Sequence, residues 1–295
     1  MVSPRIGIHT SIAGSLENAA LKAAELGANT LQIFSSSPRM WQASAHLPEQ
    51  IRAFRKTRQR LGLYPLAIHA NYLVNLASRD PAVRARSIAS FRGELERGAS
   101  IGAEYLVVHP GSYKGQTVEL AITAFVEGLR EAAAAVSLRG LSVLLENTAG
   151  CGMQIGSRFE ELRAIRDEAA QRTDVPIGYC LDTCHLLAAS YDISSKAGLD
   201  ETVALADRIL GIANVKLIHA NDSKKPLGSH ADRHANIGEG HIGRAGFRRI
   251  LAHPMLRSKP FILETPVERD GDDRRNLENL KKLCPKSRTT TTGSS

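Results

Sequence analysis

Short apolar runs recur along the chain, and most are followed by a longer stretch whose apolar residues have helical spacing. Short runs rich in Val, Ile and aromatic residues predict strands. Eight predicted strands cover residues 5–10, 30–36, 66–71, 105–111, 143–148, 177–185, 215–222 and 260–266. Five predicted helices cover residues 15–27, 48–62, 80–102, 117–136 and 157–170, several with a Ser, Thr or Asp cap and a closing Gly.

The alternation of strands and helices predicts an α/β fold with a parallel sheet. Eight such units in 295 residues favour a closed (β/α)₈ TIM barrel over a doubly wound sheet, which more often has five or six strands. No linker divides the chain, so we expect a single domain over residues 1–283. Residues 284–295 are polar and low in complexity, which predicts a disordered tail.

The composition is that of an ordinary globular protein with 43% hydrophobic residues. No apolar run is long enough to span a membrane, and the first residues lack the pattern of a secretory signal. We therefore expect a cytoplasmic protein. Separately, we expect it to be a monomer. The four cysteines have no C-x-x-C spacing, so we expect reduced thiols.

The net charge of +8 suits a polyanionic partner such as DNA. By itself this is weak support for DNA binding. The densest basic run, residues 51–60, spaces Ile51, Phe54 and Leu61 as on a helix. An amphipathic helix with a solvated basic face is the favoured interpretation of that run.

Six predicted strands end in a side chain that commonly binds metal. These residues are His69, His109, Glu146, Asp182, His219 and Glu264. A lone residue of this kind is more often a satisfied hydrogen-bonding group. The carboxyl ends of barrel strands meet at one mouth, however, and so many imidazoles and carboxylates gathered there are costly unless they are paired or bind metal.

Two further pairs extend this set. Asp182 and His185 lie three residues apart across a strand-to-helix turn, and Asp232 and His234 lie two apart, which suits chelation of one ion. With five histidines and four carboxylates, the set favours Zn²⁺, Mn²⁺ or Fe²⁺ over Mg²⁺ or Ca²⁺. Nine ligands fit two or three ions.

Three long motifs resemble the endonuclease IV family of apurinic/apyrimidinic (AP) DNA endonucleases. They are LAIHANYLVNLA (residues 66–77), GYCLDTCH (178–185) and IHANDSKKPLGSHADRH (218–234), and the resemblance extends from Arg5 to Asn279. It implies a zinc-dependent phosphodiester hydrolase that cuts double-stranded DNA 5′ to an abasic site in base excision repair. The products would be a 3′-hydroxyl and a 5′-deoxyribose phosphate.

The resemblance also implies a trinuclear zinc site, with Mn²⁺ acceptable at one or more positions. Its implied ligand groups are His69, His109 and Glu146; Glu146, Asp182, His219 and Glu264; and His185, Asp232 and His234. Glu146 would bridge two ions and is the implied catalytic residue. His9 matches no ligand position, and we expect a supporting role for it.

The family's DNA-contact positions match Arg39, Tyr72 and Leu73, which would enter the minor groove and fill the gap left by the flipped nucleotide. The surrounding segment SSSPRMW departs from the family's commoner KNQRQW, which puts contacts to the strand opposite the lesion in doubt. For Trp41, packing on the barrel rim is favoured over DNA contact. For Lys224 and Lys225 there are two interpretations, contact with a DNA phosphate and plain solvent exposure, and the sequence favours neither.

Two other functions compete with this one. A metal-dependent sugar isomerase or epimerase of the same barrel fold would use Glu146, Asp182, His219 and Glu264. It would leave His69, His109 and the Asp232–His234 pair without a role. A non-catalytic DNA-binding protein would explain the charge and leave nine convergent ligands idle.

Overall fold

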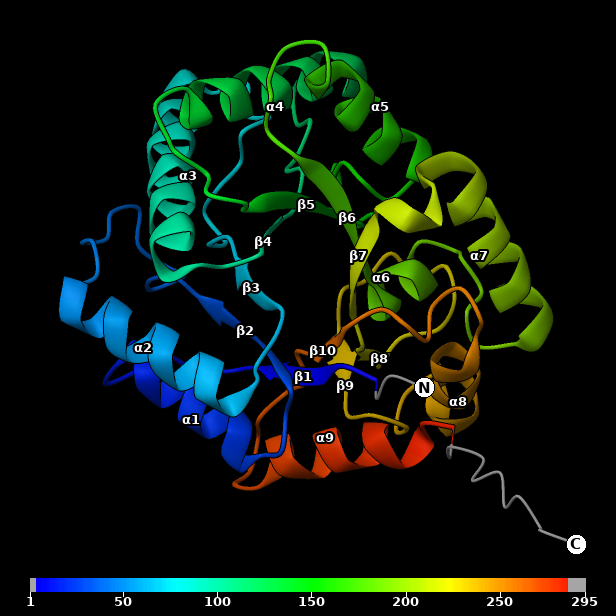
Figure 1. Cartoon of the computed structure of the whole chain (residues 1–295). Helices are drawn as coiled ribbons and strands as arrows, with labels where there is room; N and C mark the ends of the chain where they lie inside the picture. The colour runs from blue at the N-terminus through cyan, green and yellow to red at the C-terminus, as the bar shows by residue number, and fades with distance from the viewer. Residues whose placement is uncertain (1–3, 286–295) are drawn as a thin grey trace, which may run out of the picture.

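The computed structural model describes residues 4–285, so most of the predicted tail, residues 286–295, lies outside the described residues. All eight predicted strands are present and parallel, and they close into a barrel in the order β1-β10-β7-β6-β5-β4-β3-β2 (Figure 1). Their bounds are β1 Ile6–His9, β2 Thr30–Phe34, β3 Leu66–His69, β4 Tyr105–Val108, β5 Ser142–Glu146, β6 Ile177–Asp182, β7 Val215–His219 and β10 Phe261–Leu263. The predicted (β/α)₈ barrel is confirmed.

The helices surround this barrel (Figure 1). The five predicted ones are α1 Leu16–Glu25, α2 Pro48–Leu61, α3 Pro81–Ile101, α4 Val118–Ala133 and α5 Phe159–Ala169. The described chain adds α6 Thr183–Ala188, α7 Lys196–Leu210, the 3₁₀ turn η1 Ile212–Asn214, α8 Gly243–Ala252 and α9 Asp272–Leu283. Helix α6 is short and buried on all sides, so its sequence carries no amphipathic pattern.

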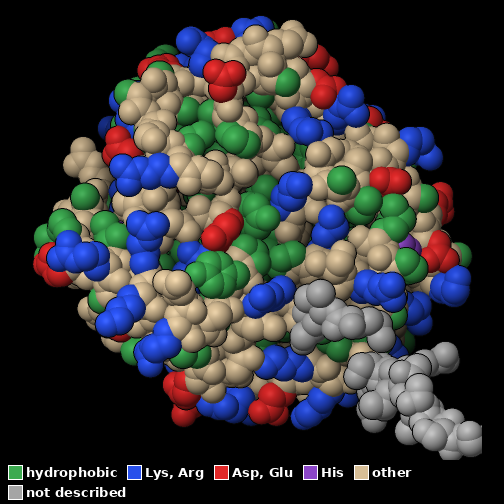
Figure 2. Space-filling model, in the orientation of Figure 1, with side chains coloured by type: hydrophobic (Ala, Val, Ile, Leu, Met, Phe, Trp, Pro, Cys, Tyr) green, Lys and Arg blue, Asp and Glu red, His purple; other side chains and the backbone are tan. Residues whose placement is uncertain are grey.

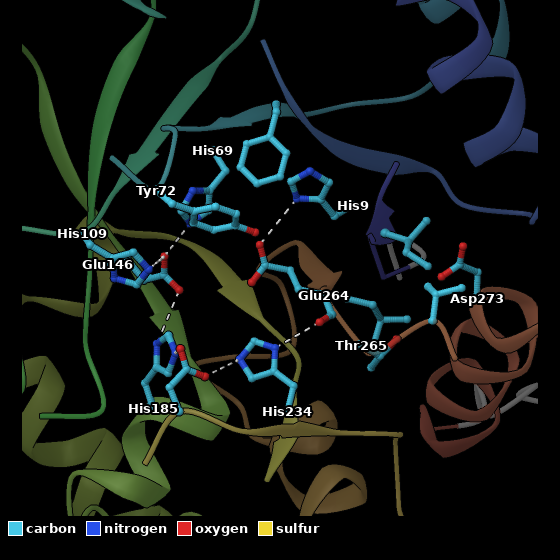
Figure 3. Close-up of a pocket in the computed structure, with 15 residues that line it drawn as sticks. His9, His69, Tyr72, His109, Glu146, His185, His234, Glu264, Thr265 and Asp273 are labelled. Atoms are coloured by element: carbon cyan, nitrogen blue, oxygen red, sulfur yellow. Dashed lines mark hydrogen bonds and ion pairs between the residues drawn. The ribbon is translucent and has the colours of Figure 1, made fainter. Parts of the chain in front are cut away.

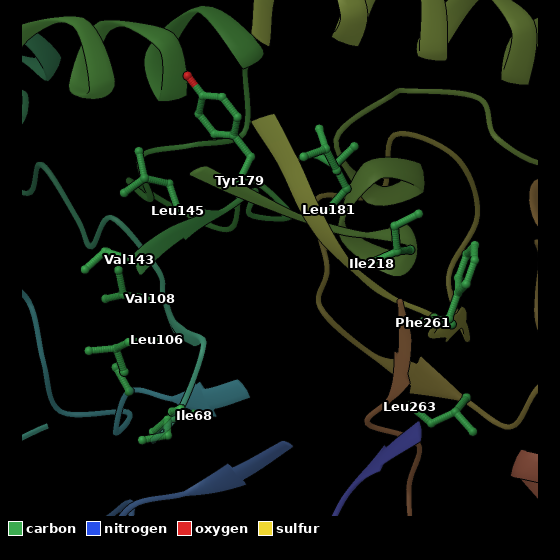
Figure 4. Packing of buried hydrophobic residues seen from close by; sticks show 14 of the residues in the cluster. Ile68, Leu106, Val108, Val143, Leu145, Tyr179, Leu181, Ile218, Phe261 and Leu263 are labelled. Carbon is green, nitrogen blue, oxygen red and sulfur yellow. The ribbon is translucent and has the colours of Figure 1, made fainter. Parts of the chain in front are cut away.

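Strand side chains alternate between two apolar layers. Residues on the outer face, including Ile68, Leu106, Val143 and Phe261, pack beneath the helices (Figure 4). The inner face contributes a separate cluster, made of Ala67, Val107, Leu144, Cys180, Leu217 and Ile262. Both faces of the sheet are therefore buried, as the near-continuous apolar runs require.

One basic residue departs from the predicted solvated face of α2. Phe54 faces the core, as the spacing predicts, but Arg58 is only 4% exposed. Its guanidinium donates to the Leu63 carbonyl at 2.9 Å and to the Glu104 carboxylate at 2.6 Å. Arg58 therefore links α2 to the root of β4 and is not available to a polyanion.

The basic side chains visible in Figure 2 are dispersed. On the face shown in Figure 2, Lys and Arg lie across the whole surface with Asp and Glu among them. Almost no histidine is visible on that face.

None of the helices in residues 4–285 has the length and apolar character that a membrane crossing needs. All four cysteines are free.

Candidate metal centre

The six strand-end ligand candidates lie on the inner side of the barrel. Each follows the inner apolar layer by two residues, as Glu146 follows Leu144 and His219 follows Leu217. Because side chains two apart on a strand share a face, the same alternation that buries the inner layer points these residues into the mouth. Four of them, His69, His109, Glu146 and Glu264, line a cavity of about 410 Å³ together with His185, Asp232 and His234 (Figure 3). Asp182 and His219 are fully buried beside these residues.

The first group of candidate ligands comprises His69, His109 and Glu146. His69 Nε2 lies 3.0 Å from Glu146 Oε2, and His109 Nε2 lies 3.4 Å from the same oxygen. Potential ligand atoms of all three residues lie within 4.8 Å of one another. This is the spacing that one shared ion requires.

The second group shares Glu146 with the first. His219 Nδ1 lies 2.8 Å from Glu146 Oε1 and 3.2 Å from Glu264 Oε2. Asp182, which is the register partner of His219 in the neighbouring strand, completes the group. The two oxygens of Glu146 therefore face different groups, as a bridging carboxylate must.

The third group brings α6 together with a distant loop. His185 Nε2 lies 3.1 Å from Asp232 Oδ2, and His234 Nε2 lies 3.3 Å from Asp232 Oδ1. Another three-residue cluster joins Asp182 and His234 to Cys184. Burial raises the pKa of the Cys184 thiol to about 12, so in the ion-free chain it is a neutral thiol.

A hairpin explains how Asp232 and His234 reach the mouth. Strand β7 continues into β8 (Asp222–Ser223), which pairs antiparallel with β9 (His234–Ala235). The buried Asp222 carboxylate accepts three backbone N–H groups from residues 238–242 at 2.9–3.0 Å. The loop that follows the hairpin is therefore anchored at its base, and the ligand-rich stretch 217–234 folds back over one site.

The histidines are oriented by bonds on their far ring nitrogens. In three of them Nδ1 faces a backbone carbonyl, and the pairs are His69 with Ala70 (2.8 Å), His185 with Asn147 (2.9 Å) and His234 with Glu264 (3.0 Å). A carbonyl only accepts, so this network assigns the proton of the neutral imidazole to Nδ1, and in that form the Nε2 lone pair faces the cluster. That is the usual support for a metal-binding histidine.

His219 has the opposite arrangement because of Gln32, a residue that the sequence analysis missed. Gln32 is fully buried in β2, and its Oε1 accepts from His219 Nε2 at 2.9 Å. Its Nε2 donates to Glu264 Oε1 at 2.5 Å and lies 3.1 Å from His9 Nδ1. The available signal was a polar residue inside an otherwise apolar strand. His9 belongs to none of the ligand groups and faces Gln32 and Glu264.

The sequence analysis also missed two asparagines close to candidate ligands. Asn147 directly follows Glu146, and Asn221 lies two residues after His219. Asn221 donates to Asp182 Oδ2 at 2.6 Å and accepts the Glu264 backbone N–H at 2.8 Å. Asn147 accepts the Asp182 backbone N–H at 2.7 Å. Asn221 therefore orients the Asp182 carboxylate, whereas Asn147 fixes the Asp182 backbone. Their position close to strand-end ligands was the only sequence signal.

The charges of the cluster act strongly on one another. Burial alone would lower the pKa of His185, but the Asp182 charge and the adjacent Asp232 carboxylate outweigh it and raise that pKa to about 10. Burial would raise the pKa of Asp232, but its close contact with His185 lowers that pKa to about 2. For Glu146, neighbouring histidines overcome burial and hold the pKa well below its ordinary value.

Two buried ring nitrogens in the cluster support a fit between this donor set and a metal. Within the described chain, His185 Nε2 and His234 Nε2 are buried, and although each lies within 3.3 Å of an Asp232 oxygen, neither has the geometry of a hydrogen bond. A buried polar atom left unpaired is costly. The lone pairs of oriented imidazoles beside carboxylates would be satisfied by a divalent cation such as Zn²⁺.

The predicted DNA-contact residues lie on the loops that follow β2 and β3, and one of them, Tyr72, lines this cavity. Tyr72 is 67% exposed, and its ring meets Phe34 edge-on at 5.3 Å. Arg39 is exposed and Leu73 is half-buried. Trp41 is half-buried and lines a different cavity, so the structure places it apart from the metal cluster.

Comparisons with known proteins agree with this geometry. A family model described as a xylose isomerase-like TIM barrel matches residues 20–283. The chain is 63% identical to the probable endonuclease 4 of Solibacter usitatus over 280 residues, which are 95% of this chain and 97% of that one. The chain belongs to the endonuclease IV family of AP DNA endonucleases. The predicted family is thereby confirmed.

Solved structures separate this family from its fold relatives. The crystal structure of endonuclease IV from Thermus thermophilus matches with a TM-score of 0.83 and 39% identity, covering 95% of this chain and 98% of that one. A D-tagatose 3-epimerase-like protein matches with a TM-score of 0.69 but 21% identity, over 94% of this chain and 96% of that one, which shows the barrel fold alone. The prediction of an endonuclease, a phosphodiester hydrolase, is confirmed.

Proposed function

We propose that this endonuclease IV family member cuts double-stranded DNA on the 5′ side of abasic sites and leaves a 3′-hydroxyl and a 5′-deoxyribose phosphate. One observation carries the proposal. Three groups of candidate ligands share one mouth, and Glu146 presents one oxygen to each of two groups. Nucleases with two metal ions use such an arrangement, in which neighbouring ions act on the same phosphodiester.

The proposed cofactors are three zinc ions per chain, with Mn²⁺ acceptable at one or more positions. His69 and His109 with Glu146 would hold one. Glu146 would bridge to a second, and the other residues of that group are Asp182, His219 and Glu264. His185, Asp232 and His234 would hold the third. Bound zinc supplies Lewis acidity and lowers the pKa of water, so no Ser or Cys nucleophile is needed.

The chain's own residues would receive the substrate. The cavity of about 410 Å³ beside the ligands is open to a single nucleotide taken out of the helix. Tyr72, Leu73 and Arg39 would contact DNA at its rim, where the exposed Tyr72 ring offers a surface for unstacked bases. We propose that the protein acts as a monomer in the cytoplasm, where it reaches the chromosome.

The decisive experiment combines elemental analysis with an incision assay. Purified protein is expected to hold zinc and to cut a duplex that carries one abasic site, producing a 3′ end that a DNA polymerase extends. The same duplex with an intact base is the control. Protein without zinc that leaves the abasic duplex uncut would refute the proposal.

A further inference from the structure

A buried ion pair lies behind the rim of the mouth, on the inner side of α3. Glu94 is 1% exposed and Arg97 is 7% exposed. Arg97 Nη2 lies 3.4 Å from Glu94 Oε2. Neither residue belongs to the metal cluster.

The pair is bonded to the root of the loop that carries Arg39. Ser35, directly after β2, is fully buried and donates its hydroxyl hydrogen to the Glu94 carboxylate. The same hydroxyl oxygen accepts from Arg97 Nε at 2.9 Å. The first residue of this loop is therefore held by both members of the ion pair.

The second loop, which carries Tyr72 and Leu73, is held at the same place. Asn71 is buried at its root, and its side chain donates to Ser90 Oγ of α3 at 2.8 Å and accepts the Leu73 N–H at 2.9 Å. The two loops also contact each other, since the Tyr72 N–H donates to the Pro38 carbonyl at 3.2 Å. Helix α3 is thus the common support of both loops.

Placing this charge in the interior is costly. Burial raises the pKa of Glu94, and the Arg97 charge with hydrogen bonds from Ser35 and the Asn71 backbone opposes that rise. Well-packed apolar residues often stabilise such a position as well as an ion pair does. Stability alone therefore does not explain why this buried carboxylate is bonded to residues at the start of two different loops.

We propose that Glu94, with Arg97, is a positioning residue for DNA recognition that fixes the Arg39 loop and the Tyr72 loop in one geometry. The recognition part rests on the proposed function. A loop held in its binding conformation loses less entropy when DNA binds, which increases affinity without a new contact. The chemistry at the zinc ligands does not depend on this pair.

Trp41 offers a direct readout of loop order. It is the only tryptophan of the chain and lies in the Arg39 loop. Together with Arg97 it lines a cavity of about 610 Å³ between this loop and α3. Its fluorescence therefore reports on the loop in the absence of DNA.

The test uses Glu94→Gln and the milder Ser35→Ala in the full zinc-loaded protein. We expect acrylamide to quench Trp41 more strongly in both variants, with the larger change in Glu94→Gln. The Kd for abasic duplex should rise about tenfold in Glu94→Gln, while zinc content and the incision rate at saturating DNA stay unchanged. Should Glu94→Gln fail to fold, Ser35→Ala decides.

Glu104→Gln is the matched control, because Glu104 also binds a buried arginine. It accepts from Arg58 at 2.6 Å but lies directly before β4, at the end of the strands opposite the mouth. It should lower thermal stability and leave Trp41 quenching and DNA affinity as in the wild type.

Two results would overturn the proposal. Unchanged Trp41 quenching in both variants would show that the pair does not order the loop. Loss of zinc in Glu94→Gln would show that it supports the barrel itself. Failure of the proposed function is distinguishable, since it would appear as wild-type protein that neither binds nor cuts abasic duplex, whereas the quenching result needs no DNA.

Discussion

The inside of the mouth and its rim differ in how their side chains are held. Inside, Glu146 and His219 are fully buried on strands, and each has bonds to two or more side chains. At the rim, Tyr72 and Arg39 are exposed on loops. A scaffold of strands suits chemistry that needs fixed distances, while loops suit contact with a large partner.

This difference predicts that changes inside the mouth remove chemistry or metal, whereas changes at the rim remove affinity. The largest effect should come from Glu146→Gln. An amide bridges two ions poorly, so incision should fall by about 10³-fold or more, because several kcal/mol of charge stabilisation are lost. Binding to abasic duplex should survive, and single-turnover incision with a separate binding titration measures both. Near-normal incision at saturating zinc would contradict the role of Glu146.

Gln32→Leu should come next. It keeps the size of the side chain but leaves His219 Nε2 and Glu264 Oε1 without their partner. Loss of such a supporting contact typically weakens metal affinity about 10- to 100-fold. Zinc release to a chelator should accelerate accordingly, and Gln59→Leu, at an exposed position on α2, is the control. Equal release rates in the two variants would show that Gln32 does not orient the ligands.

Zinc uptake should depend on pH through His185. Its pKa of about 10 in the ion-free chain means that it is protonated at pH 7 to 8, and binding requires the neutral imidazole. Zinc uptake should therefore release protons, and affinity for the His185 group should rise about tenfold per pH unit up to that pKa. Calorimetry in buffers of different ionisation enthalpy measures the proton count. Proton uptake, or affinity that falls as pH rises, would contradict this sign.

The smallest effect is expected at the rim. Replacing Tyr72 and Leu73 by Ala together should weaken binding to abasic duplex about tenfold, which corresponds to about 1.4 kcal/mol. Zinc content and thermal stability should change little, because neither residue is a ligand. Leu120→Ala, an exposed leucine on α4, is the control. Lost stability with unchanged affinity would assign these residues to packing under the loop.

The sequence alone predicted the barrel and the nine candidate ligands. Both follow from local regularities, because alternation along a strand is set by backbone geometry and the ends of parallel strands meet at one mouth. Glu146 and His219 each follow an apolar run. They could therefore be recognised as candidate ligands from the local sequence alone.

Only the tertiary structure determined which residues share a group and what supports them. His219 lies 73 residues from Glu146, and Gln32 lies 187 from His219, so these contacts depend on barrel closure and strand register. Arg58 and Glu94 have sequence neighbours typical of solvated helix faces, yet both are buried because other elements cover them. Side-chain type and local spacing specify what a residue is able to bind, and the packing of distant segments specifies what it meets.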